Sequence, residues 1–253
     1  GAEKRVYMAG TGIVGTDAER KVQRCGESGG LPTYTTPQSG GVIHEENGYC
    51  YLTANATAYR EADLIVVRGK SMNYVIDHAA PPRFNADAKI VRVDIDPDEI
   101  ARNYPVALGL MADVRTFLRQ MVEKLDARKV GKKEISAARA GWLDKIAGYK
   151  KEWDDFIAPG FTEDTTPIHP QRAAHEIDLA LPEDAILVSD IGVHHNWLIQ
   201  FCHPTRPDSL IGSMGFGPMG FGVAGVMGAK FAAPDRPCVS VCGDGAFFMH
   251  ASV

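Results

Sequence analysis

The chain is poor in cysteine, has no excess of positive charge, and contains one long stretch without any charged residue. Its five cysteines are odd in number and irregularly spaced, which argues against a disulfide scaffold. With no secretory pattern at the N-terminus, we expect a reducing, cytoplasmic compartment. The net charge of -5 and the lack of a basic stripe argue against nucleic acid as a partner. With 45% hydrophobic and 23% charged residues, the composition is that of a globular protein.

The uncharged stretch covers residues 209–229 and is long enough to raise the question of a membrane span. Glycines recur throughout it, from Gly212 to Gly228. Such a sequence favours a turn-rich loop followed by a closely packed buried helix over a helix in lipid. We therefore expect no membrane association.

Apolar runs alternate with amphipathic segments over the first half of the chain. The pattern predicts strands over residues 6–9, 32–36, 62–69 and 89–96, and a helix over 113–125. Strands that alternate with helices predict an α/β fold with a doubly wound parallel sheet.

The composition divides the chain into three parts. Residues 1–126 form the predicted nucleotide-binding-like α/β domain, and residues 127–165, rich in Lys, Arg and Ala, a linker with a surface helix. Residues 166–253 begin a second α/β domain, with a helix over 170–180 and strands over 185–190 and 238–242. On the second of these strands Cys238 and Cys242 share a face, and we expect them to pack as small apolar side chains rather than bind a metal.

Gly10, Gly12 and Gly15 fit the spacing G-x-G-x-x-G after the first strand. This pattern occurs where a pyrophosphate binds at a helix N-terminus, but a tight structural turn explains it equally well. The second strand lacks the acidic end expected for ribose binding. Asp94 and Asp96, which end the fourth strand, either bind a nucleotide or, in the case of Asp96 before Pro97, cap a helix.

Two further glycine-bearing turns follow strands of the second domain. In the first, Gly192 allows close approach of a phosphate and His194 can donate a hydrogen bond, while His195 is read as a solvent-facing loop residue. In the second, Gly243-Asp244-Gly245 is either a structural turn or a site where a carboxylate holds a hard cation beside a diphosphate.

The order and spacing of these turns resemble the diphosphate-binding domain of thiamine diphosphate enzymes, most closely the acetolactate synthase group. The likeness rests on a Gly-x-His loop at Gly192, the segment Gly215-Phe-Gly-Pro-Met-Gly-Phe-Gly222, and the Gly-Asp-Gly at Gly243. The first domain is similar to the central domain of the same family, whose Val-Asp-Ile-Asp-Pro strand end is matched by Val93 to Pro97.

The resemblance implies a role for each matched residue. The Gly217 carbonyl would accept from the 4'-amino group of thiamine diphosphate, and Met219 would hold its two rings in a bent conformation. Asp244 would bind Mg²⁺. The residues expected to contact the diphosphate are Gly192, Val193, His194, Gly243, Gly245 and Ala246.

In family members that keep FAD or an adenine nucleotide in the central domain, the matching positions are Gly10, Gly12, Asp94, Asp96 and Asp113. This sequence departs from the flavin-binding members, because Arg68-Gly-Lys-Ser71 stands where they typically have Gly-Ala-Arg.

The resemblance implies that the complete protein would be a carboligase or decarboxylase of 2-oxo acids that forms homodimers or homotetramers. The family's catalytic glutamate and second metal ligand, an asparagine, have no counterpart in these 253 residues. We therefore expect part of a longer enzyme, with binding roles and no catalytic residue in this chain. A 2-hydroxyacyl-CoA lyase or oxalyl-CoA decarboxylase, acting on acyl-CoA, is the nearest alternative. A nicotinamide-dependent oxidoreductase and a non-catalytic nucleotide-binding module are alternatives of other classes.

Overall fold

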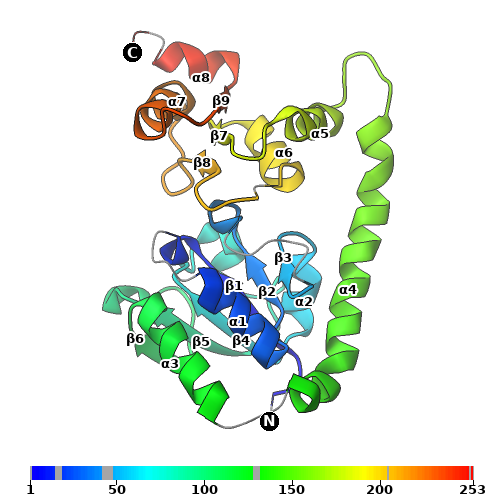
Figure 1. Ribbon diagram of the computed structural model, residues 1–253, viewed down its shortest axis with the longest axis vertical. Helices are drawn as coiled ribbons and strands as arrows, with labels where there is room; N and C mark the ends of the chain where they lie inside the picture. The colour runs from blue at the N-terminus through cyan, green and yellow to red at the C-terminus, as the bar shows by residue number, and fades with distance from the viewer. Residues whose placement is uncertain are drawn as a thin grey trace. The chain divides into compact units, whose positions relative to one another are not determined.

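The computed structural model describes residues 2–14, 19–41, 48–127, 132–203, 205–250 and 252. The chain divides into two compact units, Gly1–Trp153 and Asp154–Val253 (Figure 1).

The first unit is built on a six-stranded, all-parallel sheet in the order β3-β2-β1-β4-β5-β6. This is the strand order of the doubly wound nucleotide-binding folds, in which the topology reverses between β1 and β4. Its strands are β1 (Arg5–Ala9), β2 (Thr33–Thr35), β3 (Cys50–Tyr51), β4 (Leu64–Arg68), β5 (Lys89–Asp94) and β6 (Leu108–Met111). Its helical segments are η1 (Thr11–Ile13), α1 (Glu19–Gly29), η2 (Pro37–Ser39), α2 (Asn55–Glu61), η4 (Tyr74–Ala79), η5 (Pro97–Glu99) and α3 (Val114–Ala127), followed by α4 (Lys132–Thr162), which runs on into the second unit.

Helices cover both faces of this sheet. Val22 of α1 and Leu118 of α3 belong to the hydrophobic cluster on one face, and α1 lies beside α3 in Figure 1. Tyr59 of α2 and Ile146 of α4 belong to the cluster on the other face. The apolar run over residues 64–67 of β4 follows from this layering, because a strand covered on both sides has no face toward water.

Helix α4 differs from the surface helix expected within residues 127–165. Trp142 and Ile146, four residues apart and therefore on one side of the helix, are both buried in the core of the first unit. The Trp142 Nε1 donates a hydrogen bond of 2.9 Å to the carbonyl oxygen of Arg5 on β1. This part of α4 is thus a core element. The predicted boundaries of the linker stay a prediction.

The second unit contains a three-stranded parallel sheet in the order β8-β7-β9. Its elements are α5 (Pro170–Ala180), β7 (Ile186–Ser189), α6 (Val193–Phe201), β8 (Leu210–Gly212), α7 (Phe221–Ala232), β9 (Cys238–Val241) and α8 (Asp244–Met249). The glycines of α7 allow close packing, since a Cβ at Gly225 would lie 3.2 Å from Val188 Cγ1 on β7. Among the described helices, none combines the length and apolar character needed to cross a membrane.

Candidate functional site

Three glycine-bearing loops of the second unit follow the carboxyl ends of its three parallel strands. The loop after β7 leads into α6, the loop after β8 into α7, and the loop after β9 into α8. Because β8 and β9 flank β7 on opposite sides, the topology reverses at the end of β7. In open α/β sheets, ligands bind at this kind of position. The three motifs that the sequence analysis selected therefore lie at one edge of one sheet.

In the first loop, Gly192 makes room for His194. A Cβ at Gly192 would lie 2.8 Å from the Nδ1 and Cε1 atoms of the His194 imidazole, and one at Gly243 would lie 3.9 Å from its Cε1. The ring thus lies near both the first and the third loop. Its Nε2 atom is buried and has no hydrogen-bond partner among the described residues. A buried ring nitrogen without a partner is costly unless a ligand supplies one, and a phosphate oxygen would do so. Val193 is exposed beside it.

In the second loop, two glycines have a left-handed backbone, with φ of 72° at Gly217 and 92° at Gly220. Only glycine adopts this conformation without strain, so the turn depends on these positions. The side chain of Met219, between them, is 43% exposed and lies at the surface. The Gly217 carbonyl and Met219 are both positioned by this turn.

In the third loop, Asp244 is the first residue of α8 and is exposed. Its Oδ1 atom accepts a hydrogen bond of 2.8 Å from the Gly245 amide. A Cβ at Gly245 would meet nothing within 4 Å, so the backbone is open to a ligand there, whereas Ala246 is buried. In the described part of the chain, no group of three or more His, Cys, Asp or Glu side chains could hold a metal ion. Asp244 fits Mg²⁺ as one ligand beside phosphate oxygens and water, which is how Mg²⁺ usually binds.

Sequence reasoning assigned no role to Ser189 or Asp190 and placed His195 wrongly. His195 is not a solvent-facing loop residue, since it lies in α6, half-buried, with its Nδ1 2.9 Å from the Ser189 hydroxyl oxygen. Burial, and then the neighbouring His194, lower the pKa of His195 below its ordinary value. Asp190, fully buried after β7, accepts hydrogen bonds from the amides of Gly220 and Gly222. An acidic residue directly after a buried strand was the only available signal.

At the carboxyl edge of the first unit's sheet, the loops after β1 and β4 pack against each other. The Gly10 amide donates to the Arg68 carbonyl, and the Gly12 amide to the Gly69 carbonyl, each at 2.9 Å. A Cβ at Gly10 would lie 2.3 Å from Lys70 Cβ. These glycines serve the close approach of two loops at the point where the topology reverses. Gly15, the third glycine of the motif, lies outside the described residues.

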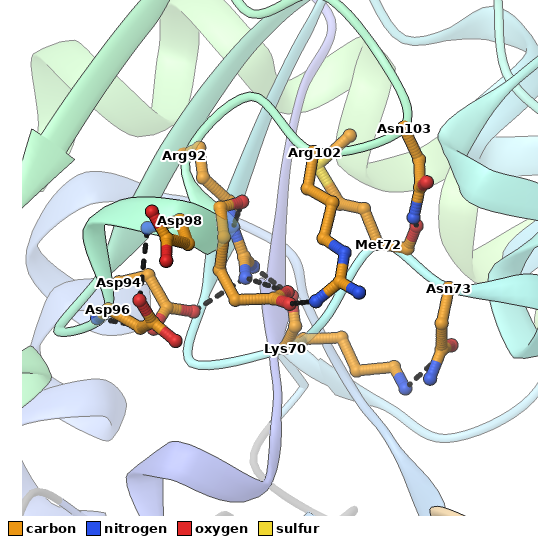
Figure 2. Close-up of polar contacts among 10 residues, drawn as sticks. Lys70, Met72, Asn73, Arg92, Asp94, Asp96, Asp98, Arg102 and Asn103 are labelled. Atoms are coloured by element: carbon orange, nitrogen blue, oxygen red, sulfur yellow. Dashed lines mark hydrogen bonds and ion pairs between the residues drawn. The ribbon is translucent and has the colours of Figure 1, made fainter.

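The three aspartates predicted for a nucleotide also have internal partners. Figure 2 shows Asp94 beside the buried Arg92, with Asp94 Oδ2 2.5 Å from Arg92 Nη2. The Asp96 carboxylate accepts from the Asp98 amide at 2.9 Å and caps η5, as one of the two interpretations expected. Asp113 accepts from the Thr116 amide at the start of α3, and this hydrogen bond lowers the pKa of Asp113.

These contacts give each of the three aspartates a structural role within the first unit, and the nucleotide assignment stays a prediction. Sequence reasoning cited Arg68 only as a departure from the flavin-binding members and did not expect its burial, with the guanidinium 4.6 Å from the centre of the Tyr7 ring. Its three side-chain nitrogens have no hydrogen-bond partner among the described residues.

Comparison with known proteins agrees with both units. Residues 1–121 match the model of the thiamine pyrophosphate enzyme central domain. Residues 190–252 match that of the thiamine pyrophosphate enzyme C-terminal TPP binding domain.

Curated relatives match almost the whole chain. A probable acetolactate synthase large subunit of Methanocaldococcus jannaschii is 30% identical over 99% of this chain and 43% of the relative. The acetolactate synthase large subunit of Corynebacterium glutamicum is 28% identical over 98% of this chain and 40% of the relative. 2-Hydroxyacyl-CoA lyase 1 of Mus musculus is 27% identical over 97% of this chain and 42% of the relative. The chain thus spans less than half the length of these relatives.

Proposed function

Because the chain belongs to the thiamine pyrophosphate enzyme family, we propose that it holds Mg²⁺-thiamine diphosphate for a carboligase or decarboxylase acting on 2-oxo acids. The observation that carries this proposal is the meeting of three glycine-bearing loops at the carboxyl edge of one parallel sheet. The His194 Nε2, buried and without a partner among the described residues, supports an anionic ligand there.

The residues of this chain bind and orient. Thiamine diphosphate, when bound, supplies a carbon nucleophile and an electron sink for breaking the bond beside the carbonyl of a 2-oxo acid. His194 Nε2 donates to a diphosphate oxygen, and the open backbone at Gly245 lets another approach the chain. Asp244 holds Mg²⁺, which neutralises the charge of the diphosphate. The Gly217 carbonyl and the Met219 side chain orient the rings. We assign no proton-transfer step to this chain.

A test of this function compares cofactor binding in the wild type and in Asp244→Asn. Isothermal titration with thiamine diphosphate, in Mg²⁺ and in a chelator, should show Mg²⁺-dependent binding to the wild type. The variant should bind about tenfold more weakly or worse, because it lacks the charged ligand. Asp235→Asn is the matched control, since it removes an equally exposed carboxylate from the same unit without touching the three loops.

Absence of binding to the wild type would overturn the proposal. Binding that is equal in wild type and Asp244→Asn would remove Asp244 from it. Binding of a reduced nicotinamide cofactor in place of thiamine diphosphate would favour the oxidoreductase alternative. Binding of another nucleotide, with no binding of thiamine diphosphate, would favour the non-catalytic nucleotide-binding module.

A 2-hydroxyacyl-CoA lyase is the second candidate, favoured by the similarity to the mouse enzyme of that name. Cleavage of a 2-hydroxyacyl-CoA between C1 and C2, into an aldehyde and a one-carbon acyl-CoA with its thioester intact, would favour it over turnover of a 2-oxo acid alone. We further propose a homodimer or homotetramer, to be measured by light scattering. We also propose a reducing, cytoplasmic location, which the odd number and irregular spacing of the five cysteines support.

A further inference from the structure

The carboxylate of Asp190 binds the start of the glycine-rich helix α7. Its Oδ2 atom accepts from the Gly222 amide at 2.8 Å, and both of its oxygens lie within 3.1 Å of the Gly220 amide nitrogen. Its Oδ1 atom also accepts from the Ile191 amide at 2.6 Å. The side chain thus bridges the end of β7 and the turn that carries Gly217 and Met219.

Asp190 also ties β7 to the third loop. Its own amide donates a hydrogen bond of 3.0 Å to the Val241 carbonyl, at the end of β9 and two residues before Gly243. Asp190 therefore contacts its own loop after β7, the turn before α7 and the last residue of β9 (Figure 1 shows β7, β9 and α7).

Burying a carboxylate is costly unless hydrogen bonds and nearby positive charge compensate it. Here the amides at the first turn of α7 supply both, because a helix N-terminus carries partial positive charge. Gly222 is matched to this arrangement. A Cβ there would lie 2.9 Å from both Cβ and Oδ2 of Asp190, so any larger residue would push the carboxylate away.

The carboxylate already occupies the anion position at the start of α7. The α7 N-terminus therefore holds an internal side chain and leaves a diphosphate to the loops around Gly192 and Gly243. In the second loop, the groups left for a cofactor are those expected to contact its rings, the Gly217 carbonyl and the Met219 side chain.

Resting on the proposed function, we propose that Asp190 is a positioning residue, which holds the Gly217–Gly220 turn in its cofactor-binding geometry before the cofactor arrives. It touches neither diphosphate nor metal. It acts through the backbone of Gly220 and Gly222, and so governs the ring-binding part of the site rather than the diphosphate-binding part.

The experiment separates these two parts with two probes, Mg²⁺-thiamine diphosphate and Mg²⁺-pyrophosphate, titrated into the wild type and Asp190→Asn. Asn has one acceptor oxygen in place of two and no charge, and its NH2 group must face an amide donor of Ile191, Gly220 or Gly222, so the turn is held more weakly. We expect the affinity for thiamine diphosphate to fall about tenfold or more, and that for pyrophosphate to change less than about threefold. Asp178→Asn is the matched control, since Asp178 Oδ1 also accepts a backbone amide, that of His203, but away from this edge.

Equal losses for both probes would mean general damage and would overturn the proposal, as would unchanged affinity for both. If the wild type binds neither probe, the proposed function itself fails and this inference with it. If the wild type binds thiamine diphosphate and Asp190→Asn binds it as well, only the inference fails.

A measurement on the wild type covers the case in which Asp190→Asn does not fold. Hydrogen exchange at the Gly220 and Gly222 amides should be slow without cofactor, because Asp190 already accepts from both. Fast exchange that slows only when thiamine diphosphate is added would overturn the proposal, since the cofactor and not Asp190 would then order the turn.

Discussion

The Tyr149 hydroxyl on α4 donates a hydrogen bond of 2.6 Å to the carboxylate of Glu61, the last residue of α2. Lys145, one turn earlier on α4, also pairs with Glu61. These polar contacts lie at the edge of the same packing in which Trp142 and Ile146 are buried, and they join two helices on one face of the first unit's sheet. The stability of the first unit should therefore depend on α4.

The Glu61 contacts predict a pH dependence. The hydrogen bonds from Lys145 and Tyr149 lower the pKa of Glu61 from 4.5 to about 2. The stabilisation is complete above pH 4.5 and falls as the pH drops toward 2, because the unfolded state takes up the proton first. Solvent screening of these partly exposed groups limits it to about 1 kcal/mol. Urea unfolding at several pH values should show this slope, which Glu61→Gln should reduce and Glu123→Gln, in an exposed pair, should not.

Replacing Trp142 tests whether α4 is a core element. Trp142→Ala should lower the free energy of unfolding of the first unit by about 3–5 kcal/mol, because it opens a cavity in the core. Trp142→Phe should cost about 1 kcal/mol, mainly through the lost hydrogen bond to the Arg5 carbonyl. Denaturant unfolding measures both, with Glu152→Ala, an exposed position on α4, as the control. Two near-neutral Trp142 variants would show that the helix does not dock.

Two buried arginines should differ in how much stability the same substitution costs. Arg92 pairs with Asp94 and donates to the Lys70 carbonyl, so Arg92→Met leaves buried groups without partners and should cost about 3–5 kcal/mol. Arg68 contacts the Tyr7 ring but has no hydrogen-bond partner among the described residues. Arg68→Met should therefore cost less than about 1 kcal/mol or stabilise the fold. Melting temperatures of the two variants compare them directly, and equal losses would contradict the prediction.

The His195–Ser189 contact predicts a titration below the ordinary range. Burial lowers the pKa of His195 from 6.5, so the unfolded state is protonated first as the pH falls. The folded state keeps its full relative stability above pH 6.5 and becomes less stable below it. NMR titration of the His195 ring should give a pKa under 6.5, and His195→Gln should flatten the pH dependence of unfolding. A ring that titrates above 6.5 would mean that it is not buried against Ser189.

The cysteines should differ in reactivity. Burial raises the pKa of Cys25 to about 11 and that of Cys202 to about 12. Cys238 is only partly buried. With a thiol reagent at about pH 8, Cys238 should be labelled at least about tenfold faster than Cys25 or Cys202, because burial shields these two from the reagent and disfavours their reactive thiolate form. Mass spectrometry of peptides over time measures this order, and uniform rates would indicate an open fold.

Much of the architecture could be read from the sequence, because local pattern decides it. The helix predicted over residues 170–180 is α5 (Pro170–Ala180), and the strand predicted over 238–242 is β9 (Cys238–Val241). Both have a clear hydrophobic pattern with turn residues at their ends. Strand β8 (Leu210–Gly212) escaped notice, because three residues in a glycine-rich stretch carry too little pattern to mark a strand.

The sequence by itself determined where apolar segments are followed by glycine-rich turns. It therefore indicated that three loops of the second unit could hold a ligand. Alternation and glycine are local properties, so they can be read along the chain. Only the tertiary structure decided which groups already have partners. Asp190 meets Gly222, Asp94 meets a buried Arg92, and Gly12 donates to Gly69. These contacts depend on which strands are neighbours in the sheet, and a local sequence pattern does not determine that.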